Sequence, residues 1–563
     1  MEYKYDKHPV IDCRRYGKTI NGRENILSEL KGKNRLIVEL YPGVDKAAVL
    51  SLLSPLSLSD VIDTDTLRKD NELLRREFEE FITDDRVFGY MCPRDMEYVF
   101  NPDKLSEAKE RAQKSDSLLV IGVGASLVST EGTLVYADIS RWEIQLRYRK
   151  GLSNWLISNA QAPNLQKFKI GYFIEWRMAD RRKMSVFEDI AYFLDTHTAP
   201  VLVNGESVRE ALKSIPSAPF RLEPYFDPGV WGGQWMKRKF DLPEGTKNYA
   251  WSFDGVPEEN AINLGFEGGV IKLPAINAVL YTPERLLGSR VYGRYGAEFP
   301  IRFDFLDTME GGNLSLQVHP LTSYIQKKFG MHYTQDESYY LLDAEEGASV
   351  YLGIKTGCNK DEMINELKKA EKGEKAFDAE KFVNRIKAKK HDHFLIPAGT
   401  VHCSGSGSMV LEISATPYIF TFKLWDWGRV GLDGIPRPVH IDHGRENIQF
   451  NRDTDFVMKN LVNHFSVLEE NDGVKVELTG LDVREPIETR RYTIQDTYTV
   501  NMNGSVQMLN LVDGKACLIE SPSGSFKPFE VHYAETFIIP AEVGKYRVKA
   551  LDGPVMLLEA RVR

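Results

Sequence analysis

The chain has 563 residues, 42% of them hydrophobic and 27% charged, which is ordinary for a folded protein but too long for one hydrophobic core. Its formal net charge of -9 lacks the excess of positive charge typical of nucleic-acid-binding proteins, which argues against nucleic acid as a partner. The five cysteines lie far apart with no CxxC pair, which indicates a reducing compartment rather than a disulfide framework. Because the first residues lack an apolar leader and no long apolar run follows, we expect a cytoplasmic protein with no membrane partner.

Residues 1–215 are predicted to form an α/β domain. Residues 35–41 have the apolar character of a buried strand, 42–46 form a tight turn, and 47–53 are helical, which is the position of a P-loop. A phosphate cradle needs several glycines and a Lys followed by Ser or Thr, whereas this turn keeps Gly43 alone and Lys46 precedes Ala. The segment resembles a degenerate version of the uridine-kinase-like P-loop fold. A purely structural strand and helix is the favoured interpretation, and retained nucleotide binding stays open.

Two further elements are predicted in this domain. Residues 117–124 form a continuous apolar run typical of a buried parallel strand, and 136–149 are predicted to be an amphipathic helix. Arg141, Arg147 and Arg149, with the basic stretch 176–183, form either an anion site or, as the favoured alternative, a solvated charged face.

A connector with prolines and serines at 213–219 predicts a domain boundary. We expect a metal-binding domain at 216–450, with a helical insertion at about 358–390 in which two helices cover one face of a β core. From 451 to 563 the pattern turns to short strands separated by Gly and Asp turns, which predicts a C-terminal β domain.

Four polar residues in the middle of the chain form a candidate metal site. Residues 314–319 are predicted to be a strand, so Gln317 and His319 point to the same face, and Pro320 ends the strand near an open edge. Glu337 lies at the start of a second strand, and His402 follows a Pro-Ala-Gly-Thr turn. Two imidazoles, a carboxylate and an amide oxygen suit zinc acting as a Lewis acid. Taken singly, each histidine also fits a hydrogen-bonded structural residue.

The amino-acid sequence of these segments resembles that of the type I mannose-6-phosphate isomerases. The resemblance covers roughly 216–563 and includes the Trp-Gly-Gly at 231–233, the Leu-Ser-Leu-Gln-Val-His-Pro at 314–320, the segment 396–402 and the Leu-Trp-Asp-Trp-Gly-Arg at 424–429. It implies a zinc cupin catalytic domain of jelly-roll type followed by a second cupin-like domain. It also implies zinc ligands at Gln317, His319, Glu337 and His402, a catalytic and substrate-binding Arg429, and a substrate-binding Ser315 near the sugar phosphate.

The resemblance implies a metal-dependent aldose–ketose isomerase that interconverts mannose 6-phosphate and fructose 6-phosphate, or a related sugar phosphate, through a cis-enediol. Zn²⁺ is the expected cofactor, and the always cationic Arg429 suits stabilisation of an enediolate. The alternatives are that Arg429 only pairs with Asp426, and that the hydroxyl of Ser315 is satisfied by the backbone.

Two departures from the family pattern put the substrate in doubt. Gln335 replaces a Lys that the family places before the metal-binding Glu, and Asp304 stands where the family has another Lys. Loss of two point charges weakens a phosphate site. A zinc cupin that binds sugar without turnover, acting as a sensor, and a kinase–isomerase fusion therefore remain alternatives. The sequence leaves the oligomeric state and the catalytic base open.

Overall fold

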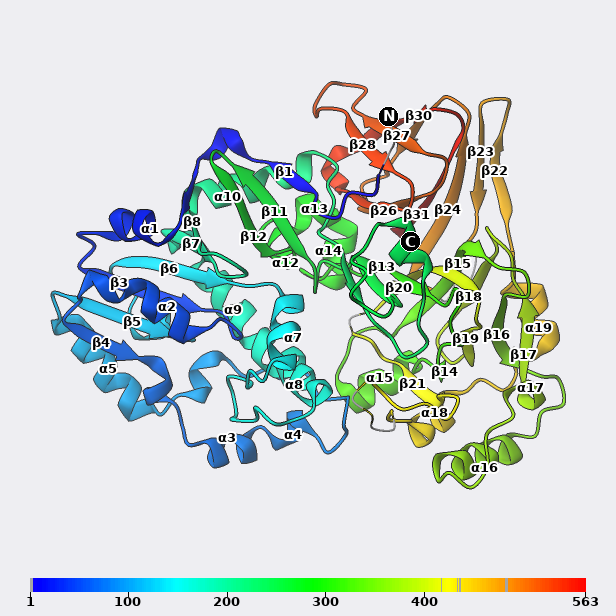
Figure 1. Cartoon of the computed structure of the whole chain (residues 1–563), viewed down its shortest axis with the longest axis horizontal. Helices are drawn as coiled ribbons and strands as arrows, with labels where there is room; N and C mark the ends of the chain where they lie inside the picture. The colour runs from blue at the N-terminus through cyan, green and yellow to red at the C-terminus, as the bar shows by residue number, and fades with distance from the viewer. Residues whose placement is uncertain (1–3, 417, 433, 435–436, 481–484) are drawn as a thin grey trace. The chain divides into compact units, whose positions relative to one another are not determined.

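The computed structural model describes residues 4–416, 418–432, 434, 437–480 and 485–563. The chain divides into two compact units (Figure 1). The α/β unit contains residues 9–214 and 257–282, and the β unit contains residues 1–8, 215–256 and 283–563. Chain order placed the boundary between the α/β and β parts near 215.

Two segments cross that expected boundary because of the partners they find. Residues 257–282 belong to the α/β unit, where β11 (Ala261–Phe266) pairs with β1 (Val10–Asp12) and with β12 (Gly269–Pro274). The first eight residues belong to the β unit, where the ring of Tyr5 stacks on Phe240 and its hydroxyl donates to Asp254. The further division at 450 remains a prediction.

A seven-stranded sheet forms the centre of the α/β unit. Five neighbouring strands of this sheet are parallel. At one end β8 pairs with them antiparallel, and β2 pairs antiparallel with β8. In spatial order the strands are β4 (Asp60–Asp63), β5 (Leu118–Gly122), β3 (Arg35–Leu40), β6 (Thr133–Asp138), β7 (Tyr192–Asp195), β8 (Val201–Asn204) and β2 (Thr19–Asn21).

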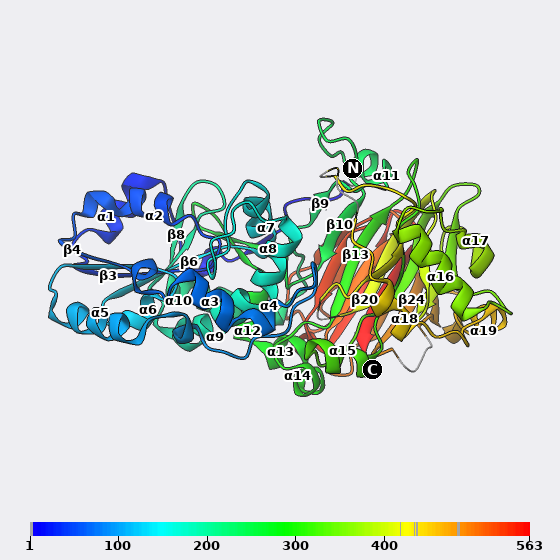
Figure 2. The same cartoon turned by 90° about the horizontal axis from the view of Figure 1, so that it is seen from below.

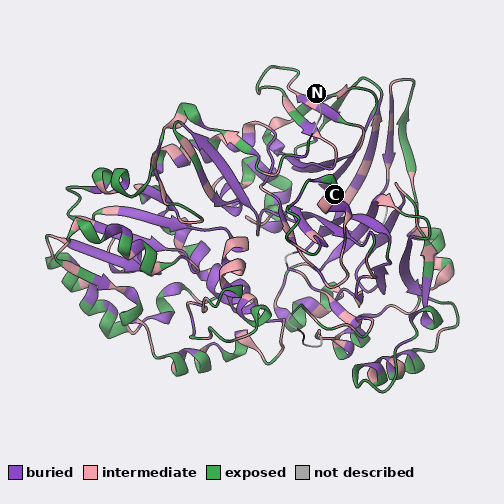
Figure 3. Ribbon diagram, in the orientation of Figure 1, coloured by how far each residue is buried: buried purple, intermediate pink, exposed green. Residues whose placement is uncertain are grey.

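Helices lie on both faces of this sheet, with α1 and α2 on one side and α5 and α10 on the other (Figure 2). The central strands are buried while the outer faces of the helices are exposed (Figure 3). The α/β unit contains α1 (Arg23–Leu30), α2 (Lys46–Leu53), α3 (Asn71–Glu77), α4 (Glu79–Ile82), α5 (Pro102–Lys114), α6 (Ala125–Val128), α7 (Arg141–Arg149), α8 (Asn164–Ile170), α9 (Trp176–Val186), α10 (Gly205–Ser214) and α12 (Ile276–Tyr281).

The predicted strands at 35–41 and 117–124 and the helix at 47–53 are confirmed as β3, β5 and α2. The helix predicted over 136–149 is wrong in its first part. Residues Thr133–Asp138 form β6, because their apolar run pairs with β3, and the helix begins only after Ser140, whose hydroxyl accepts from the N–H of Glu143.

The turn after β3 does not form a phosphate cradle. Asp45 caps α2 by accepting a hydrogen bond from the N–H of Ala48, so a carboxylate lies where a phosphate would meet the helix. Lys46 turns to Asp63, at 2.7 Å, and to Asp65. A relationship of this sheet to kinases stays a prediction.

Some of the predicted basic residues form internal ion pairs, whereas Arg149 and Arg181 are exposed, so neither an anion site nor a solvated face describes them all. Arg141 is buried against Asp180 and Glu258, and Lys183 is buried 2.8 Å from Asp138. Each cation meets carboxylates from distant segments, which sequence spacing cannot show.

Two antiparallel sheets surround the candidate site in the β unit. The first contains, in order, β18 (His393–Ile396), β15 (Asp336–Ala344), β20 (Ser408–Ala415), β13 (Ile301–Asp307), β10 (Trp251–Gly255) and β9 (Tyr225–Asp227). The second contains β17 (Val383–Lys387), β16 (Ser349–Ile354), β19 (His402–Ser404), β14 (Leu316–Val318) and β21 (Phe422–Trp425).

The predicted insertion at 358–390 is helical only in part. One helix covers Lys360–Glu371, but the second is a single turn at Ala379–Phe382 that runs directly into β17. The apolar Val383 and Ile386 pair with β16 instead of forming a helix face. The β unit contains α11 (Trp235–Lys239), α13 (Pro283–Leu287), α14 (Ser289–Tyr295), α15 (Thr322–Phe329), α16 (Lys360–Glu371), α17 (Ala379–Phe382), α18 (Ile441–Asn447) and α19 (Thr454–Asn460).

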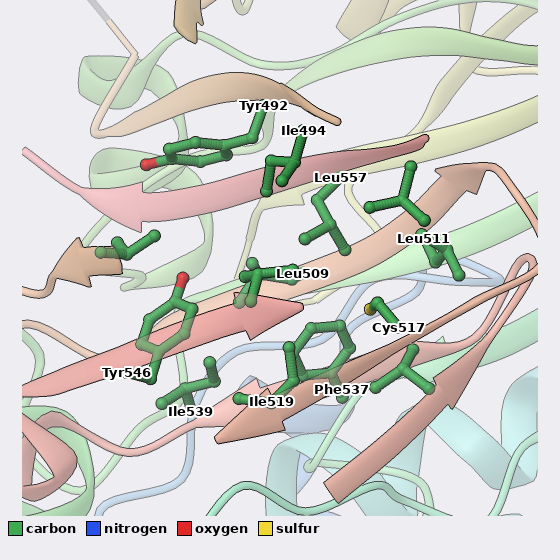
Figure 4. Close-up of a cluster of buried hydrophobic side chains, with 14 of the residues drawn as sticks. Tyr492, Ile494, Leu509, Leu511, Cys517, Ile519, Phe537, Ile539, Tyr546 and Leu557 are labelled. Atoms are coloured by element: carbon green, nitrogen blue, oxygen red, sulfur yellow. The ribbon is translucent and has the colours of Figure 1, made fainter. Parts of the chain in front are cut away.

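The C-terminal part of the β unit has its own core, in which aliphatic and aromatic side chains such as Leu509 and Phe537 meet between two sheets (Figure 4). One sheet contains β22 (Ser466–Glu470), β23 (Val474–Leu478), β24 (Ile487–Ile494), β31 (Val555–Val562), β26 (Gln507–Asp513) and β29 (Thr536–Ile539). The other contains β25 (Thr497–Asn501), β30 (Lys545–Leu551), β27 (Ala516–Glu520) and β28 (Phe529–His532). Among the residues described, none of the helices combines the length and apolar character needed to cross a bilayer.

Candidate metal centre

Three neighbouring strands bring the predicted ligands together. Gln317 of β14 lies directly opposite His402, the first residue of β19, and His319 follows β14 immediately. Glu337 comes from β15 in the other sheet. Side chains of the two sheets therefore meet at one point.

His319, Glu337 and His402 are fully buried and form the cluster that could hold a metal ion, with one ligand atom from each lying within 4.8 Å of the others. Nε2 of His319 is 3.1 Å from Oε2 of Glu337, and Nε2 of His402 is 2.8 Å from Oε1. The amide nitrogen of Gln317 is 3.1 Å from Nε2 of His402, and a half-turn of that amide presents its oxygen instead.

Backbone carbonyls fix both imidazoles from behind. Nδ1 of His319 lies 2.8 Å from the carbonyl oxygen of Phe420, and Nδ1 of His402 lies 2.9 Å from that of Thr400. Because a carbonyl can only accept, each Nδ1 is the protonated donor, and each Nε2 faces the cluster. Metal-binding histidines are oriented in this way.

Gln335 supports the carboxylate. Its amide nitrogen donates to Oε2 of Glu337 at 2.9 Å, and its amide oxygen accepts from the N–H of Phe420 at 2.9 Å. The residue that replaces the family's Lys is therefore buried and connects Glu337 to the peptide segment that also orients His319.

The charges of the site are strongly coupled. Burial opposes ionisation of Glu337, but the two imidazoles outweigh it and hold its pKa well below the usual value. Glu412, on β20 next to Glu337, has its pKa raised well above the usual value by burial and by repulsion from Glu337 and Asp304. Within this carboxylate pair the negative charge is therefore favoured on Glu337.

The donor set fits a divalent metal. Nε2 of His319 and Oε1 of Glu337 are buried and lack hydrogen-bond geometry to any partner, although both lie close to opposite members of the cluster. Buried polar atoms without a hydrogen bond call for another partner, and a cation can fill that role. Two imidazoles, one carboxylate and an amide match the preferences of zinc.

Ser315 and Arg429 are joined through Asp426. Asp426 accepts from the hydroxyl of Ser315 at 2.8 Å and from Nη2 of Arg429 at 2.8 Å. Arg437 adds a second guanidinium, 3.1 Å from the hydroxyl of Ser315 and 3.0 Å from Asp426. Two cations against one carboxylate leave this cluster positive and suited to a phosphate.

This cluster lies close to the metal ligands, because Arg429 and Asp426 both act electrostatically on the buried thiol of Cys403, the neighbour of His402. The expected pairing of Arg429 with Asp426 is present, but it also includes Ser315. The hydroxyl of Ser315 is satisfied by a side chain and not by the backbone.

Sequence reasoning missed three residues of the site. Gln335 was treated as a lost Lys, whereas it supports Glu337. Arg437 follows a glycine- and proline-containing segment and carried no motif signal. Glu412 could have been found, since it is a single carboxylate within the apolar run of β20.

Facing antiparallel sheets that hold a buried His–Glu–His cluster define a β fold with a candidate metal centre. A solved structure described as a mannose 6-phosphate isomerase from Bacillus subtilis has this fold, with a TM-score of 0.50 and 20% identity over 61% of this chain and 100% of that chain.

Curated relatives carry related names. YvyI of Bacillus subtilis (strain 168), with a provisional mannose-6-phosphate isomerase name, is 23% identical over 345 residues, which is 59% of this chain and 96% of the relative. A mannose-6-phosphate isomerase of Streptococcus mutans is 26% identical over 226 residues, covering 40% of this chain and 66% of the relative. Homology to mannose-6-phosphate isomerases thus spans about 40–60% of the chain.

The α/β unit has a different relationship. Residues 22–217 match a family described as "Domain of unknown function (DUF8485)".

Proposed function

We propose that the β unit is a metal-dependent aldose–ketose isomerase that interconverts mannose 6-phosphate and fructose 6-phosphate, or a closely related sugar phosphate. The observation that carries the proposal is the buried cluster of His319, Glu337 and His402, with Nε2 of both rings facing inward. Homology to proteins named mannose-6-phosphate isomerases supports the substrate class.

His319, Glu337 and His402, with Gln317 in its oxygen-inward orientation, would hold zinc. The bound ion would supply Lewis-acid polarisation of the sugar's oxygens. The residues behind it keep the ligands in place. Phe420 and Thr400 fix the two imidazoles through their carbonyls, and Gln335 holds the carboxylate.

The positive cluster of Ser315, Arg429 and Arg437 supports the substrate assignment. Isomerisation moves a proton between C1 and C2 through a cis-enediol, and the negative charge of its enediolate form needs a fixed cation. Arg429 is anchored by Asp426 in two places, through the side chain at 2.8 Å and the carbonyl at 3.2 Å, and cannot lose its charge at neutral pH. Arg437 and Ser315 would bind the phosphate of the same substrate.

Arg437 supplies a positive charge in a chain that has Gln335 and Asp304 where the family pattern has two lysines. It is a partly buried cation that the family comparison did not predict, and it contacts the hydroxyl expected near the phosphate. A phosphorylated sugar therefore remains the best candidate substrate, although the identity of the sugar is part of the proposal.

The test is fructose 6-phosphate formation from mannose 6-phosphate by the full chain, with chelator and then added zinc. We expect turnover that chelator abolishes and zinc restores. His319→Ala should lose metal and activity together, while the exposed His464→Ala should keep both. Full activity of metal-free His319→Ala would overturn the proposal. Zinc binding without turnover of any hexose 6-phosphate would favour a sensor.

A further inference from the structure

A cavity in the α/β unit lies outside the proposed isomerase site. It has a volume of about 660 Å³ and is lined by α2, by α7 and by the connection between β7 and β8. This volume is within the range of small-molecule pockets, about 300–1,000 Å³. Its lining includes charged, hydroxyl and aliphatic side chains.

The sheet topology places this cavity where open α/β folds bind ligands. From β3 the chain goes to β4 and β5 on one side, then crosses to β6 and β7 on the other. The cavity is lined by segments that follow the carboxyl ends of β3, β6 and β7. Ligands of such sheets bind at this edge, where the strand order reverses.

Arg147 lines the cavity with a guanidinium that is held in a fixed position. Its Nε donates to Glu143 at 3.1 Å, its Nη1 to the carbonyl of Gly43 at 3.1 Å, and its Nη2 to the carbonyl of Thr196 at 2.6 Å. Three separate segments therefore hold the guanidinium plane. A planar guanidinium held in this way suits stacking on an aromatic ring, and little rotamer entropy is left to lose on binding.

The wall from α2 is apolar. Ala48, Val49 and Leu52 lie along one side of this helix and line the cavity. An aliphatic surface and a guanidinium plane in one cavity fit a flat heteroaromatic ring, which gains from burial on one face and from stacking on the other.

The charges disfavour a polyphosphate. Asp45 accepts from the N–H of Ala48, so the N-terminus of α2 already has a carboxylate. Arg147 is paired with Glu143, and the opposite charges of Asp45 and Lys150 cancel in sum, so the lining is close to neutral. A ligand with hydroxyl and amino donors is a better match for the carboxylates of Asp45 and Glu143 than an anion is.

A histidine in the wall is rigid. Nδ1 of His197 lies 2.6 Å from Asp195, and its Nε2 accepts from the N–H of Ser140 at 3.1 Å. The hydroxyl of Ser140 is also 3.0 Å from Nε2, but the backbone N–H occupies that lone pair and Ser140 is buried. The Asp–His–Ser chain thus fixes the wall and does not activate a nucleophile.

We propose that this cavity binds a neutral nucleoside, with its base against Arg147 and its sugar hydroxyls near Asp45. The site is independent of the isomerase proposal, because its residues all belong to the α/β unit.

The experiment is isothermal titration calorimetry of the full chain with adenosine, guanosine, cytidine, uridine and ATP. Two variants test the place of binding. Ala48→Phe puts a ring into the cavity, whereas Ala47→Phe adds the same ring at an exposed neighbour outside it. Arg147→Lys removes the flat surface, and Arg149→Lys is its control on the same helix.

We expect saturable binding of at least one nucleoside, weakened about tenfold or more by Ala48→Phe and by Arg147→Lys, a loss consistent with one stacking contact. The two control variants should bind like the parent. Circular dichroism melting identifies any variant that fails to fold, and the other variant then decides. Absence of saturable binding for all four nucleosides, equal binding by Ala48→Phe, or tighter binding of ATP than of adenosine would overturn the proposal.

Discussion

The amide of Gln335 donates a 2.9 Å hydrogen bond to Oε2 of Glu337. Its oxygen accepts from the N–H of Phe420, whose carbonyl accepts from His319. One side chain therefore couples the position of two proposed ligands. The substitution of a Lys by Gln at this position removes a charge but adds a support for the metal centre.

Gln335→Ala should weaken zinc binding by about 10–100-fold, as expected when a group that orients a ligand is lost. Competition with a chromophoric chelator measures this affinity directly, without reference to turnover. The matched control is Gln326→Ala, on the exposed face of α15. Unchanged zinc affinity of Gln335→Ala would show that Glu337 is held by other contacts.

Arg437→Gln should raise KM for the sugar phosphate about tenfold or more, because one charged hydrogen bond contributes about 1.5–3 kcal/mol. The metal content should not change, since Arg437 contacts Ser315 and Asp426 and none of the proposed ligands. Steady-state kinetics with metal analysis test both points. Arg445→Gln, at an exposed position of α18, is the control. An unchanged KM would remove Arg437 from the phosphate site.

His393 predicts a loss of stability in acid. Burial, reinforced by Arg491, lowers its pKa from 6.5 to about 3, and both ring nitrogens are buried without hydrogen-bond partners. Between these two pKa values the imidazole of His393 is therefore protonated in the unfolded chain and neutral in the folded chain. The free energy of unfolding keeps its full value above pH 6.5. It falls by up to about 1.4 kcal/mol per pH unit as the pH drops toward 3.

His393→Leu should flatten this part of the profile while leaving stability near pH 7 little changed, because the volumes are similar and no hydrogen bond is lost. Urea midpoints measured from pH 7 to pH 4 test the difference. The exposed His464→Leu should follow the parent. A parallel profile for His393→Leu would contradict the assignment.

Lys183→Met should destabilise the α/β unit by about 3–5 kcal/mol, because Asp138 is then left charged and buried. The double variant Lys183→Met with Asp138→Asn should recover much of the loss, since no isolated charge remains. Thermal melts of the four proteins give the coupling free energy. Additive effects of the two substitutions would mean that the pair is not energetically linked.

The proposed ligands could be predicted because each depends on local information. Strand alternation places Gln317 beside His319, and the turn before His402 is written in four consecutive residues. The supports could not be predicted in the same way. Gln335 reaches Phe420 only through the fold, and the pairing of Arg437 with Ser315 joins residues more than a hundred positions apart.

The errors in secondary structure have the same origin. Residues 136–138 belong to β6 because β3 is available as a neighbour, and Val383–Lys387 form a strand because β16 pairs with them. Helical periodicity was present in both segments, but pairing with a strand overrode it. A domain boundary read from composition also cannot detect a segment that returns to an earlier unit.

The chain passes between its two units four times, after residues 8, 214, 256 and 282. Neither unit is therefore a contiguous stretch of the gene. A fragment ending at 215 would lack Asn277, which contacts Lys183, and Glu258, which pairs with Arg141. Truncation at 215 would break both contacts, so we expect it to destabilise the α/β unit.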